Sequence, residues 1–304
     1  MARILIIKLG ALGDLVQAFA PFAAIRRYHP DDRLALLTTR PFAALCSASP
    51  WFDEVLVDER PAWWHAGRVM ALRRMLRGHD FVYDLQTSSR SQRYFRLAGR
   101  PPWSGIARGA SHPHDNPGRD LMHTRERQAD QLARAGIAVV PVPDLAWLAV
   151  QGPHLPGPYA LLVPGAAPHR PAKRWPAARF AELAGLLWAR GLRPVVVGAG
   201  GDAPLAQVIL RACPQALDLT GQTSLLELGG VAARAALAVG NDTGPMHLAA
   251  AMGARCIVLF SAQSDPALTA PRGPDPGSVT VLRAGDLATL PVADVASRVA
   301  ASPG

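Results

Sequence analysis

Short apolar runs alternate with longer amphipathic stretches along the first half of the chain. The run at residues 3–9 precedes a Gly-containing turn, and an amphipathic stretch then extends to about residue 28. A strand, a glycine loop and a helix in this order are typical of a doubly wound α/β sheet. The segment 100–119 is rich in Pro, Gly and His and is predicted to be mostly loop. Further strands are expected at 34–38, 54–57 and 81–85, and helices at 41–48, 62–76, 91–98 and 125–136.

The alternation restarts after a Pro/Gly stretch at residues 152–158. Strands are expected at 159–163, 194–197, 216–219, 235–239 and 256–260, with helices at 177–190, 203–212, 224–234 and directly after residue 239. Two αβ halves around one linker predict two Rossmann-like domains that face each other across a cleft. The predicted boundaries are 1–153 for the first domain, 158–290 for the second, and 291–304 for a C-terminal helix that packs either back on the first domain or on the second.

Charge and composition narrow the class of protein. A net charge of +9 and a pI near 10.4 favour an anionic partner, such as a nucleic acid, a membrane surface or a phosphorylated substrate. No basic run, zinc-finger spacing or RNA-binding aromatic signature is present, which disfavours nucleic acid. The three cysteines are scattered and indicate no disulfide framework. Neither a signal peptide nor an apolar stretch long enough to span a bilayer occurs, so we expect a cytoplasmic protein.

Lysine is rare in this chain. Only two of the 32 basic residues are lysines, Lys8 and Lys173, and each stands beside a glycine-containing loop. Because arginine is the basic residue at nearly every other position, this pattern indicates that these two positions need a compact ammonium group.

The stretch from Val239 to Ala251 joins an apolar run to an Ala-rich segment that is predicted to be helical. Asp242 or Thr243 suits the N-cap of this helix, and Pro245 suits its first turn. A helix N-terminus beyond the carboxyl end of a strand is where α/β sheets bind diphosphates. The alternative is an ordinary capped helix.

A second loop, at residues 163–176, follows the first strand of the second half. Gly165 permits a close approach of the backbone to a ligand, and the adjacent cations Lys173 and Arg174 can neutralise a diphosphate. The alternative is a solvated Lys-Arg pair before a helix. The chain has neither a G-x-G-x-x-G fingerprint after its first strand nor a G-x-x-x-x-G-K-[ST] sequence.

Three motifs occur in a fixed order: Gly10-Ala-Leu-Gly13-Asp14, the Pro-Gly…Lys-Arg-Trp-Pro loop, and Val-Gly-Asn-Asp-Thr-Gly-Pro-Met-His ending at His247. In these motifs the chain resembles glycosyltransferase family 9, the ADP-heptose:lipopolysaccharide heptosyltransferases. The resemblance implies a GT-B fold and an inverting, metal-independent transfer of heptose from ADP-heptose to a lipopolysaccharide inner-core acceptor. It implies no cofactor besides this donor, and a location in peripheral contact with the cytoplasmic face of the inner membrane.

The resemblance also assigns roles to residues. Asp14 is the implied general base, and its alternative role is helix capping. His247 is implied at the donor site, and its alternative is a buried helix histidine. The implied donor-binding residues are Gly165, Lys173, Arg174, Asp202, Asp242, Thr243, Gly244 and His247. The implied acceptor-binding residues are Gly13 and Gln86, and we add Arg90 and Arg93, which follow the strand that ends near Gln86.

Several alternatives stay open at this point. Many relatives carry Ser or Thr where this chain has Ala166 and Ala167, so a donor other than ADP-heptose is one alternative. A non-catalytic nucleotide-binding module and an NAD-type dehydrogenase are others, although the missing fingerprint argues against the dehydrogenase. The stretch 63–77, with two Trp and four Arg, predicts either a solvated basic helix face or a surface for an anionic membrane or acceptor. The sequence His112-Pro-His114 has no further ligands in its loop and predicts surface residues rather than a metal site.

Overall fold

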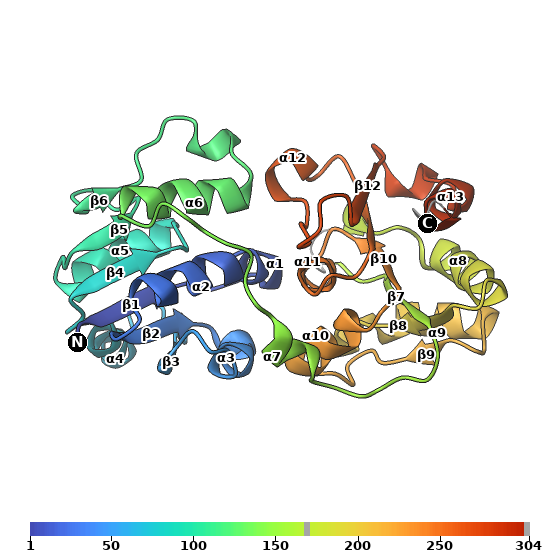
Figure 1. Ribbon diagram of the computed structural model, residues 1–304, viewed down its shortest axis with the longest axis horizontal. Helices are drawn as coiled ribbons and strands as arrows, with labels where there is room; N and C mark the ends of the chain where they lie inside the picture. The colour runs from blue at the N-terminus through green and yellow to red at the C-terminus, as the bar shows by residue number, and fades with distance from the viewer. Residues whose placement is uncertain (167–170, 301–304) are drawn as a thin grey trace. The chain divides into compact units, whose positions relative to one another are not determined.

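A computed structural model describes residues 1–166 and 171–300 and divides the chain into two compact units, Met1–Asp144 and Leu145–Gly304 (Figure 1). Each unit is built on one parallel sheet of six strands with helices on its faces. The fold class predicted from the sequence is therefore confirmed.

The first unit has the strand order β3-β2-β1-β4-β5-β6. Its strands are β1 (Arg3–Ile7), β2 (Arg33–Thr38), β3 (Glu54–Val57), β4 (Phe81–Asp84), β5 (Trp103–Gly105) and β6 (His112–Pro113). Its helices are α1 (Leu12–Val16), α2 (Phe19–Tyr28), α3 (Arg40–Ser47), α4 (Ala66–Leu76), α5 (Ser89–Ala98) and α6 (Thr124–Arg134), with a 3-10 turn η1 at Arg119–Leu121.

Both faces of this sheet are covered, which explains why its strands are nearly continuous apolar runs. Leu5 and Ile7 of β1 pack with buried residues of α4 and α5 on one face. Ile4 and Ile6 alternate with them and point to the opposite face, over which α2 and α6 lie (Figure 1).

The second unit has the strand order β12-β11-β10-β7-β8-β9. Its strands are β7 (Tyr159–Val163), β8 (Arg193–Val196), β9 (Leu217–Asp218), β10 (Leu237–Asn241), β11 (Cys256–Phe260) and β12 (Val279–Arg283). Its helices are α7 (Ala146–Ala149), α8 (Ala177–Ala189), α9 (Ala203–Ala212), α10 (Leu225–Ala233), α11 (Gly244–Ala251), α12 (Pro266–Thr269) and α13 (Val292–Ala300), with 3-10 turns η2 (Pro171–Lys173), η3 (Gly200–Asp202) and η4 (Leu287–Thr289).

The two sheets share one topology. Counted from the first strand of each unit, both have the order 3-2-1-4-5-6, so the direction of winding reverses between β1 and β4 and between β7 and β10. In doubly wound folds the loops after such strand pairs turn to opposite faces of the sheet, and ligands bind at the carboxyl edge between them. In each unit the motifs singled out from the sequence follow these strands.

The C-terminal helix α13 packs on the second unit. Val292, Val295 and Val299 join the core that α8 and α9 form against one face of the second sheet. The sequence left open which half receives this helix, and the apolar positions at i, i+3 and i+7 face the second unit because its sheet face carries the complementary apolar residues. Residues 301–304 lie outside the described part of the chain.

Helix α7 and the Pro/Gly stretch after it also pack on the second unit. Arg234, at the end of α10, donates hydrogen bonds from its guanidinium to the carbonyls of Ala149, Gln151 and Pro153 at 2.8, 3.0 and 2.8 Å. The stretch that the sequence marks as a linker is thus fixed by a side chain at its beginning.

Three strands and one interruption of a helix were not predicted from the sequence. Strands β5 and β6 lie in the segment predicted to be loop, and they are only three and two residues long. Strand β12 lies at a sheet edge and is mostly half-buried, so its apolar signal is weak. The amphipathic stretch after the first glycine loop forms two helices, α1 and α2, instead of one. None of the helices in the described ranges has the length and apolar character that crossing a bilayer requires.

The contact between α10 and the segment after α7 depends on glycine. A Cβ atom on Gly230 would lie 1.7 Å from the carbonyl oxygen of Gln151, a backbone atom that cannot rotate away. We expect Gly230→Ala to lower the free energy of unfolding by about 1–3 kcal/mol, because overpacking forces the backbone apart. Gly185→Ala in α8 is the control, since nothing lies within 4 Å of its added Cβ, and alanine there should stabilise the helix by about 0.5–1 kcal/mol. Urea denaturation of both variants measures the difference, and equal stabilities would contradict the packing argument.

Candidate active site

The buried side chain of Asn241, the last residue of β10, lies at the switch point of the second sheet, where the strand order reverses between β7 and β10. Its amide nitrogen donates to the carbonyls of Pro164 and Gly165 at 2.8 and 3.3 Å, and its oxygen accepts from the backbone N–H of Trp175 at 2.9 Å. Strands β7 and β10 are neighbours, so Asn241 reaches both ends of the loop that follows β7. This one side chain therefore holds the loop that carries Lys173. Sequence reasoning assigned Asn241 no role, although a polar residue at the end of a buried strand is a signal in itself.

Beside this clamp, Lys173 and Asp242 form a largely buried ion pair. The ammonium of Lys173 lies 2.7 Å from Oδ2 of Asp242, and the two side chains expose 11% and 9% of their surface. His247, one helical turn into α11, brings its Nε2 to 3.8 Å from the other carboxylate oxygen of Asp242. Three residues that the sequence placed at a donor site are thus brought together here.

The charge state of Asp242 follows from its neighbours. Burial by itself favours the protonated acid, but His247 and the Lys173 ammonium outweigh it and lower the pKa of Asp242 to about 2. The carboxylate is therefore ionised at neutral pH and compensates the charge of Lys173. An ammonium has three N–H donors, and only one is needed for Asp242, so two remain for oxygen atoms of a ligand.

Asp202 lies against the same loop. An added Cβ on Gly165 would meet the Asp202 carboxylate at 2.5 Å, and one on Gly198 would meet it at 2.8 Å. One carboxylate oxygen accepts a hydrogen bond from the N–H of Ala199 at 3.0 Å, which holds the side chain at the carboxyl end of β8. A side chain at position 165 would therefore displace the Asp202 carboxylate from its place against the loop.

Helix α11 begins at this crevice, with Thr243 as its N-cap and Gly244 as its first residue. The Thr243 hydroxyl does not cap the helix, because it donates to the carbonyl of Asn241 at 3.3 Å. The N–H groups of the first turn therefore have no side-chain cap, and with the helix dipole they provide a positive end suited to an anion.

Arg174 is turned toward its own loop. Its guanidinium donates to the carbonyl of Ala166 at 2.9 Å, while its Nε is buried without a hydrogen-bond partner in the described part of the chain. Ala167, one of the two alanines that distinguish this loop, lies outside the described residues. Arg174 thereby stabilises the loop from its carboxyl end.

In the first unit, Gly13 and Asp14 lie in helix α1, directly after the loop that follows β1. The N-cap of α1 is Ala11, which has no polar side chain, so Asp14 stands inside the first turn and does not cap the helix. The Asp14 side chain is half-buried. A carboxylate in this position is stabilised by the free N–H groups of the turn and stays accessible.

Gln86 closes the switch point of the first sheet. Its side-chain oxygen accepts from the N–H of Leu9 at 2.8 Å, so it ties the loop after β4 to the loop after β1. This bond leaves the amide nitrogen of Gln86 for other partners. The structure thus places Gln86 next to the strand that leads to Asp14.

Arg90 and Arg93 on α5 both stack on Trp63. Their guanidinium carbons lie 5.1 and 5.2 Å from the centre of the indole ring. Arg90 also donates to the hydroxyl of Tyr94 at 3.3 Å, and Tyr94 in turn donates to the buried carboxylate of Asp58 at 2.5 Å. This network, which the sequence did not predict, holds both arginines beside the carboxyl edge of the first sheet.

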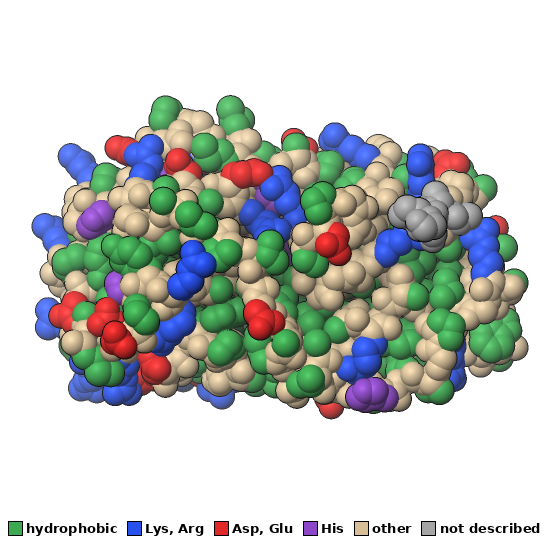
Figure 2. Space-filling model, in the orientation of Figure 1, with side chains coloured by type: hydrophobic (Ala, Val, Ile, Leu, Met, Phe, Trp, Pro, Cys, Tyr) green, Lys and Arg blue, Asp and Glu red, His purple; other side chains and the backbone are tan. Residues whose placement is uncertain are grey.

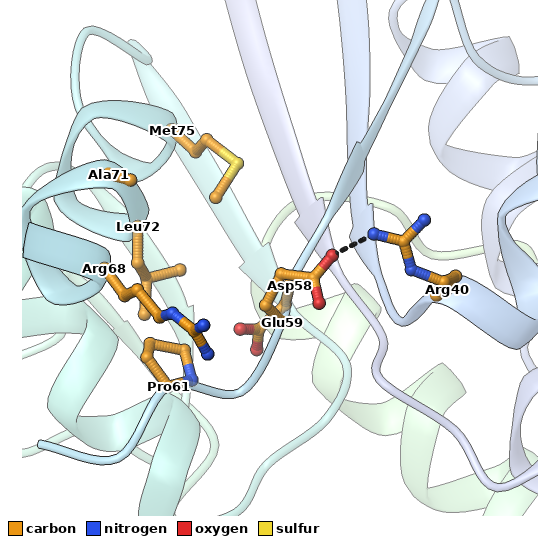
Figure 3. A pocket seen from close by; sticks show the side chains of 8 residues that line it. All are labelled: Arg40, Asp58, Glu59, Pro61, Arg68, Ala71, Leu72 and Met75. Atoms are coloured by element: carbon orange, nitrogen blue, oxygen red, sulfur yellow. Dashed lines mark hydrogen bonds and ion pairs between the residues drawn. The ribbon is translucent and has the colours of Figure 1, made fainter. Parts of the chain in front are cut away.

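A pocket of about 300 Å³ lies between α4 and the loop after β3 (Figure 3). Arg40 is paired with Glu59 in it, and Arg68 points toward the two carboxylates of Asp58 and Glu59. Since the pocket holds two cations and two carboxylates, its charge is balanced and it is not an anion site. Its apolar wall comes from α4, through Ala71, Leu72 and Met75.

The His-x-His sequence belongs to the framework of the first unit. His114 is buried, contrary to the expected surface position, and its Nε2 bonds the carboxylate of Asp130 at 2.8 Å. His112 contacts the hydroxyl of Ser111 through Nδ1 at 2.9 Å. Across residues 1–166 and 171–300, no group of three or more His, Cys, Asp or Glu side chains is arranged to hold a metal ion.

The geometry defines a class of protein: two doubly wound units, each with polar and charged side chains at its switch point, as in nucleotide-dependent transferases of the GT-B fold. The sequence pattern of glycosyltransferase family 9 (heptosyltransferase) matches residues 69–291, and the chain belongs to this family.

Relatives share stretches of sequence with this chain, and solved structures share its fold. The chain is 35% identical over 122 residues to lipooligosaccharide heptosyltransferase 2 of Haemophilus influenzae, covering 38% of this chain and 35% of that one. It is 37% identical over 106 residues to lipopolysaccharide heptosyltransferase 2 of Escherichia coli, covering 33% and 30%. These alignments span about a third of each relative's length. The structure of E. coli heptosyltransferase WaaC with ADP is similar at a TM-score of 0.82 and 23% identity, covering 98% and 99% of the two chains. E. coli ADP-heptose lps heptosyltransferase II is similar at a TM-score of 0.76 and 22% identity, covering 98% of each.

The Asn241 clamp makes a testable contribution to stability. Asn241→Ala removes three hydrogen bonds and leaves buried backbone groups unpaired, so we expect the free energy of unfolding to fall by about 2–4 kcal/mol. Asn116→Ala in the first unit is the control: its side chain donates to Asp130 at 3.1 Å and accepts from the N–H of Gly118 at 2.9 Å, but at a half-buried site where water can replace both bonds, so about 1 kcal/mol is expected there. Urea titrations followed by circular dichroism measure the free energy of unfolding of both variants. If Asn241→Ala lowers it no more than Asn116→Ala does, the loop after β7 does not depend on Asn241 for its stability.

Proposed function

We propose that this protein is an inverting glycosyltransferase that moves heptose from ADP-heptose to a lipopolysaccharide inner-core acceptor. The observation that carries the proposal is the buried Lys173–Asp242 pair at the switch point of the second sheet, on a loop held by Asn241. Family membership supports the reaction class. The similarity to lipooligosaccharide heptosyltransferase 2 and to the ADP-bound WaaC structure supports the donor and the acceptor.

The donor diphosphate fits the switch point of the second sheet. Two free N–H donors of Lys173, the backbone and hydroxyl of Thr243, and the N-terminus of α11 through Gly244 would bind its oxygens. The loop backbone at Gly165 and the guanidinium of Arg174 would contact the same group. Asp202 would accept hydrogen bonds from hydroxyl groups of the nucleoside. Asp242 and His247 would hold Lys173 in place. These groups supply the positive charge for the leaving diphosphate, so the proposal includes neither a metal ion nor a cofactor.

Asp14 would be the general base. It would take the proton of an acceptor hydroxyl as that oxygen bonds to the anomeric carbon, while the carbon–oxygen bond to the diphosphate breaks and ADP leaves with the electron pair. One displacement of this kind inverts the anomeric configuration. Gly13 and Gln86 would border the acceptor beside Asp14, and Arg90 and Arg93 would bind its anionic groups.

Two alternatives differ from this proposal in a measurable way. A family member with another nucleotide-sugar donor would have the same diphosphate site but would bind a nucleotide other than ADP beside Asp202. A nucleotide-binding module without catalysis would keep the donor site and have no need of Asp14.

We also propose that helix α4 contacts the cytoplasmic face of an anionic membrane. No acidic residue occurs between Arg60 and His79, whereas four arginines do, at 68, 73, 74 and 77. Trp64 is 81% exposed and Met70 is 44% exposed, so apolar side chains stand among these cations. Figure 2 shows Lys and Arg side chains gathered at the corner of the first unit where Figure 1 places α4. Indole rings and arginines together favour the interface of an anionic bilayer.

Nucleotide binding tests the donor site first. Calorimetric titration should show that ADP binds more tightly than UDP, with and without Mg²⁺. Lys173→Ala should weaken ADP binding by about 1.5–3 kcal/mol, the usual worth of a hydrogen bond to a charged group. Arg211→Ala is the matched control, because this exposed arginine lies in the last turn of α9, at the opposite edge of the sheet, and should leave the affinity unchanged. Asp14→Asn should retain ADP binding and lose transfer of heptose from ADP-heptose to lipopolysaccharide inner-core acceptors, whether or not these already carry a heptose.

The outcomes separate the alternatives. Preference for UDP would retain the family and exclude ADP-heptose. Equal transfer by Asp14→Asn and the wild type would remove Asp14 from catalysis, and ADP binding without any transfer would favour the binding module. Absence of nucleotide binding would refute the proposal as a whole.

Vesicle flotation tests the membrane contact. The protein should bind vesicles that contain anionic phosphatidylglycerol and not vesicles of phosphatidylcholine alone. Arg74→Gln/Arg77→Gln should lower the partition coefficient at least tenfold, since each arginine near an anionic surface is worth about 1 kcal/mol. Arg211→Gln/Arg283→Gln removes the same charge from exposed positions of the second unit and should change it far less. Equal losses in both pairs would mean that net charge, and not α4, governs binding.

A further inference from the structure

The first unit contains a buried carboxylate that the reaction proposed above does not use. Asp58 exposes 2% of its surface and directly follows strand β3. Removal of a carboxylate from water is costly, so it persists only where hydrogen bonds or charges compensate it. The two oxygens of Asp58 accept hydrogen bonds from two different residues, and each bond leads to a different part of the carboxyl edge of the first sheet.

The first bond orients Arg90 through Tyr94. The hydroxyl of Tyr94 on α5 donates to Oδ2 of Asp58 at 2.5 Å. Burial, together with the hydrogen bond to the carboxylate, raises the pKa of Tyr94, so the hydroxyl keeps its proton. Its oxygen accepts from the guanidinium of Arg90, one helical turn earlier, at 3.3 Å. Because the hydroxyl proton is used for Asp58, the lone pairs of the oxygen remain for Arg90 and fix the orientation of that side chain.

The second bond fixes the backbone of Arg60. Its N–H donates to Oδ1 of Asp58 at 2.7 Å. Arg60 has a φ of 48°, a left-handed conformation that costs energy in residues other than glycine. The hydrogen bond to Asp58 compensates part of this cost. From this position the guanidinium of Arg60 donates to the carbonyl of Leu9, in the loop after β1, at 2.9 Å.

Leu9 is the residue at which the loop after β1 is attached to its neighbours. Its carbonyl also accepts from the hydroxyl of Thr39 at 3.1 Å, and its N–H donates to Gln86 at 2.8 Å. Residues that follow β2, β3 and β4 thus all bond Leu9. Helix α1, which carries Asp14, begins three residues later, so a displacement of Leu9 is passed on to the start of this helix. A small error in the position of a catalytic group is enough to slow a reaction.

We infer that Asp58 is a positioning residue that serves two parts of the first unit: one carboxylate oxygen fixes the acceptor-binding Arg90, and the other fixes the loop that leads to Asp14. The inference rests on the functions proposed for Arg90 and Asp14. It goes beyond them because it assigns the orientation of the acceptor and the position of the general base to one buried group. Asp58 acts through Tyr94 and Arg60 and needs no contact with a substrate.

Kinetics can separate the two contacts. Tyr94→Phe removes the hydroxyl between Asp58 and Arg90, so the KM for the lipopolysaccharide acceptor should rise about fivefold while kcat stays the same. Arg60→Met keeps most of the length of the side chain but removes the bond to Leu9, so kcat should fall about tenfold while the acceptor KM stays the same. Arg60→Lys retains a charged N–H donor and should restore most of kcat.

Glu59→Gln is the matched control. It removes a carboxylate from the neighbouring position, where the side chain pairs with Arg40, and it should change neither kcat nor the acceptor KM. The affinity for ADP should be the same in all these variants, because the donor site belongs to the second unit. If Tyr94→Phe and Arg60→Met changed kcat and KM alike, the network would have a purely structural role and the inference would be overturned.

Hydrogen exchange tests the second contact without activity. Mass spectrometry of a peptide that covers residues 8–16 should show faster amide exchange in Arg60→Met and Asp58→Ala than in the wild type, and no change in Glu59→Gln. Unchanged exchange in Arg60→Met would overturn the inference, whether or not the protein transfers heptose. If Asp58→Ala does not fold, Arg60→Met and Tyr94→Phe decide. A wild type without transferase activity would refute the proposed function and leave the exchange result to decide on the contact between Asp58 and the loop.

Discussion

The reversal of strand order in each sheet is the constraint from which the rest of the site follows. Where β1 meets β4 and β7 meets β10, the outgoing loops turn to opposite faces, so no further main-chain ladder holds them at the carboxyl edge. Side chains instead hold these loops at the carboxyl edge. Asn241 bonds the loop after β7, Gln86 bonds the loop after β1, and Lys8 bonds the chain beyond β4. The crevice and the groups that shape it therefore have one topological cause.

The site combines this rigidity with enclosed charge. The Lys173–Asp242 pair is removed from water, and its attraction and hydrogen bonding must offset the loss of hydration. Such a pair contributes little to stability when compared with an apolar substitute, but it places an ammonium whose one hydrogen bond to the described residues goes to Asp242. Among the residues that the structure describes, Nδ1 of the buried His247 has no hydrogen-bond partner, as expected of a polar group that is kept for a ligand at the expense of stability.

How far the sequence predicts this structure depends on how deeply each element is buried. Strands such as β1 and β7 are enclosed on both faces, and their unbroken apolar runs placed them within two residues. Strands β5, β6 and β12 are short or lie toward a sheet edge, and no periodicity marks them. The loop motifs predicted which residues gather at the second switch point, because loops after neighbouring parallel strands meet at one edge. The clamp by Asn241 joins residues 66 to 77 positions apart, and nothing local in the sequence encodes those partners.

The near absence of lysine gives this protein an uncommon chemical surface. Guanidinium groups keep their charge at any pH at which a protein stays folded, so the arginines give the exterior a positive charge that does not titrate. Both lysine amines lie inside, one at each switch point. Reagents that acylate amines therefore find no exposed lysine, and the rate at which they reach Lys8 or Lys173 measures how often each crevice opens. Each unit thus contains one buried lysine whose acylation rate reports how often its surroundings open to solvent.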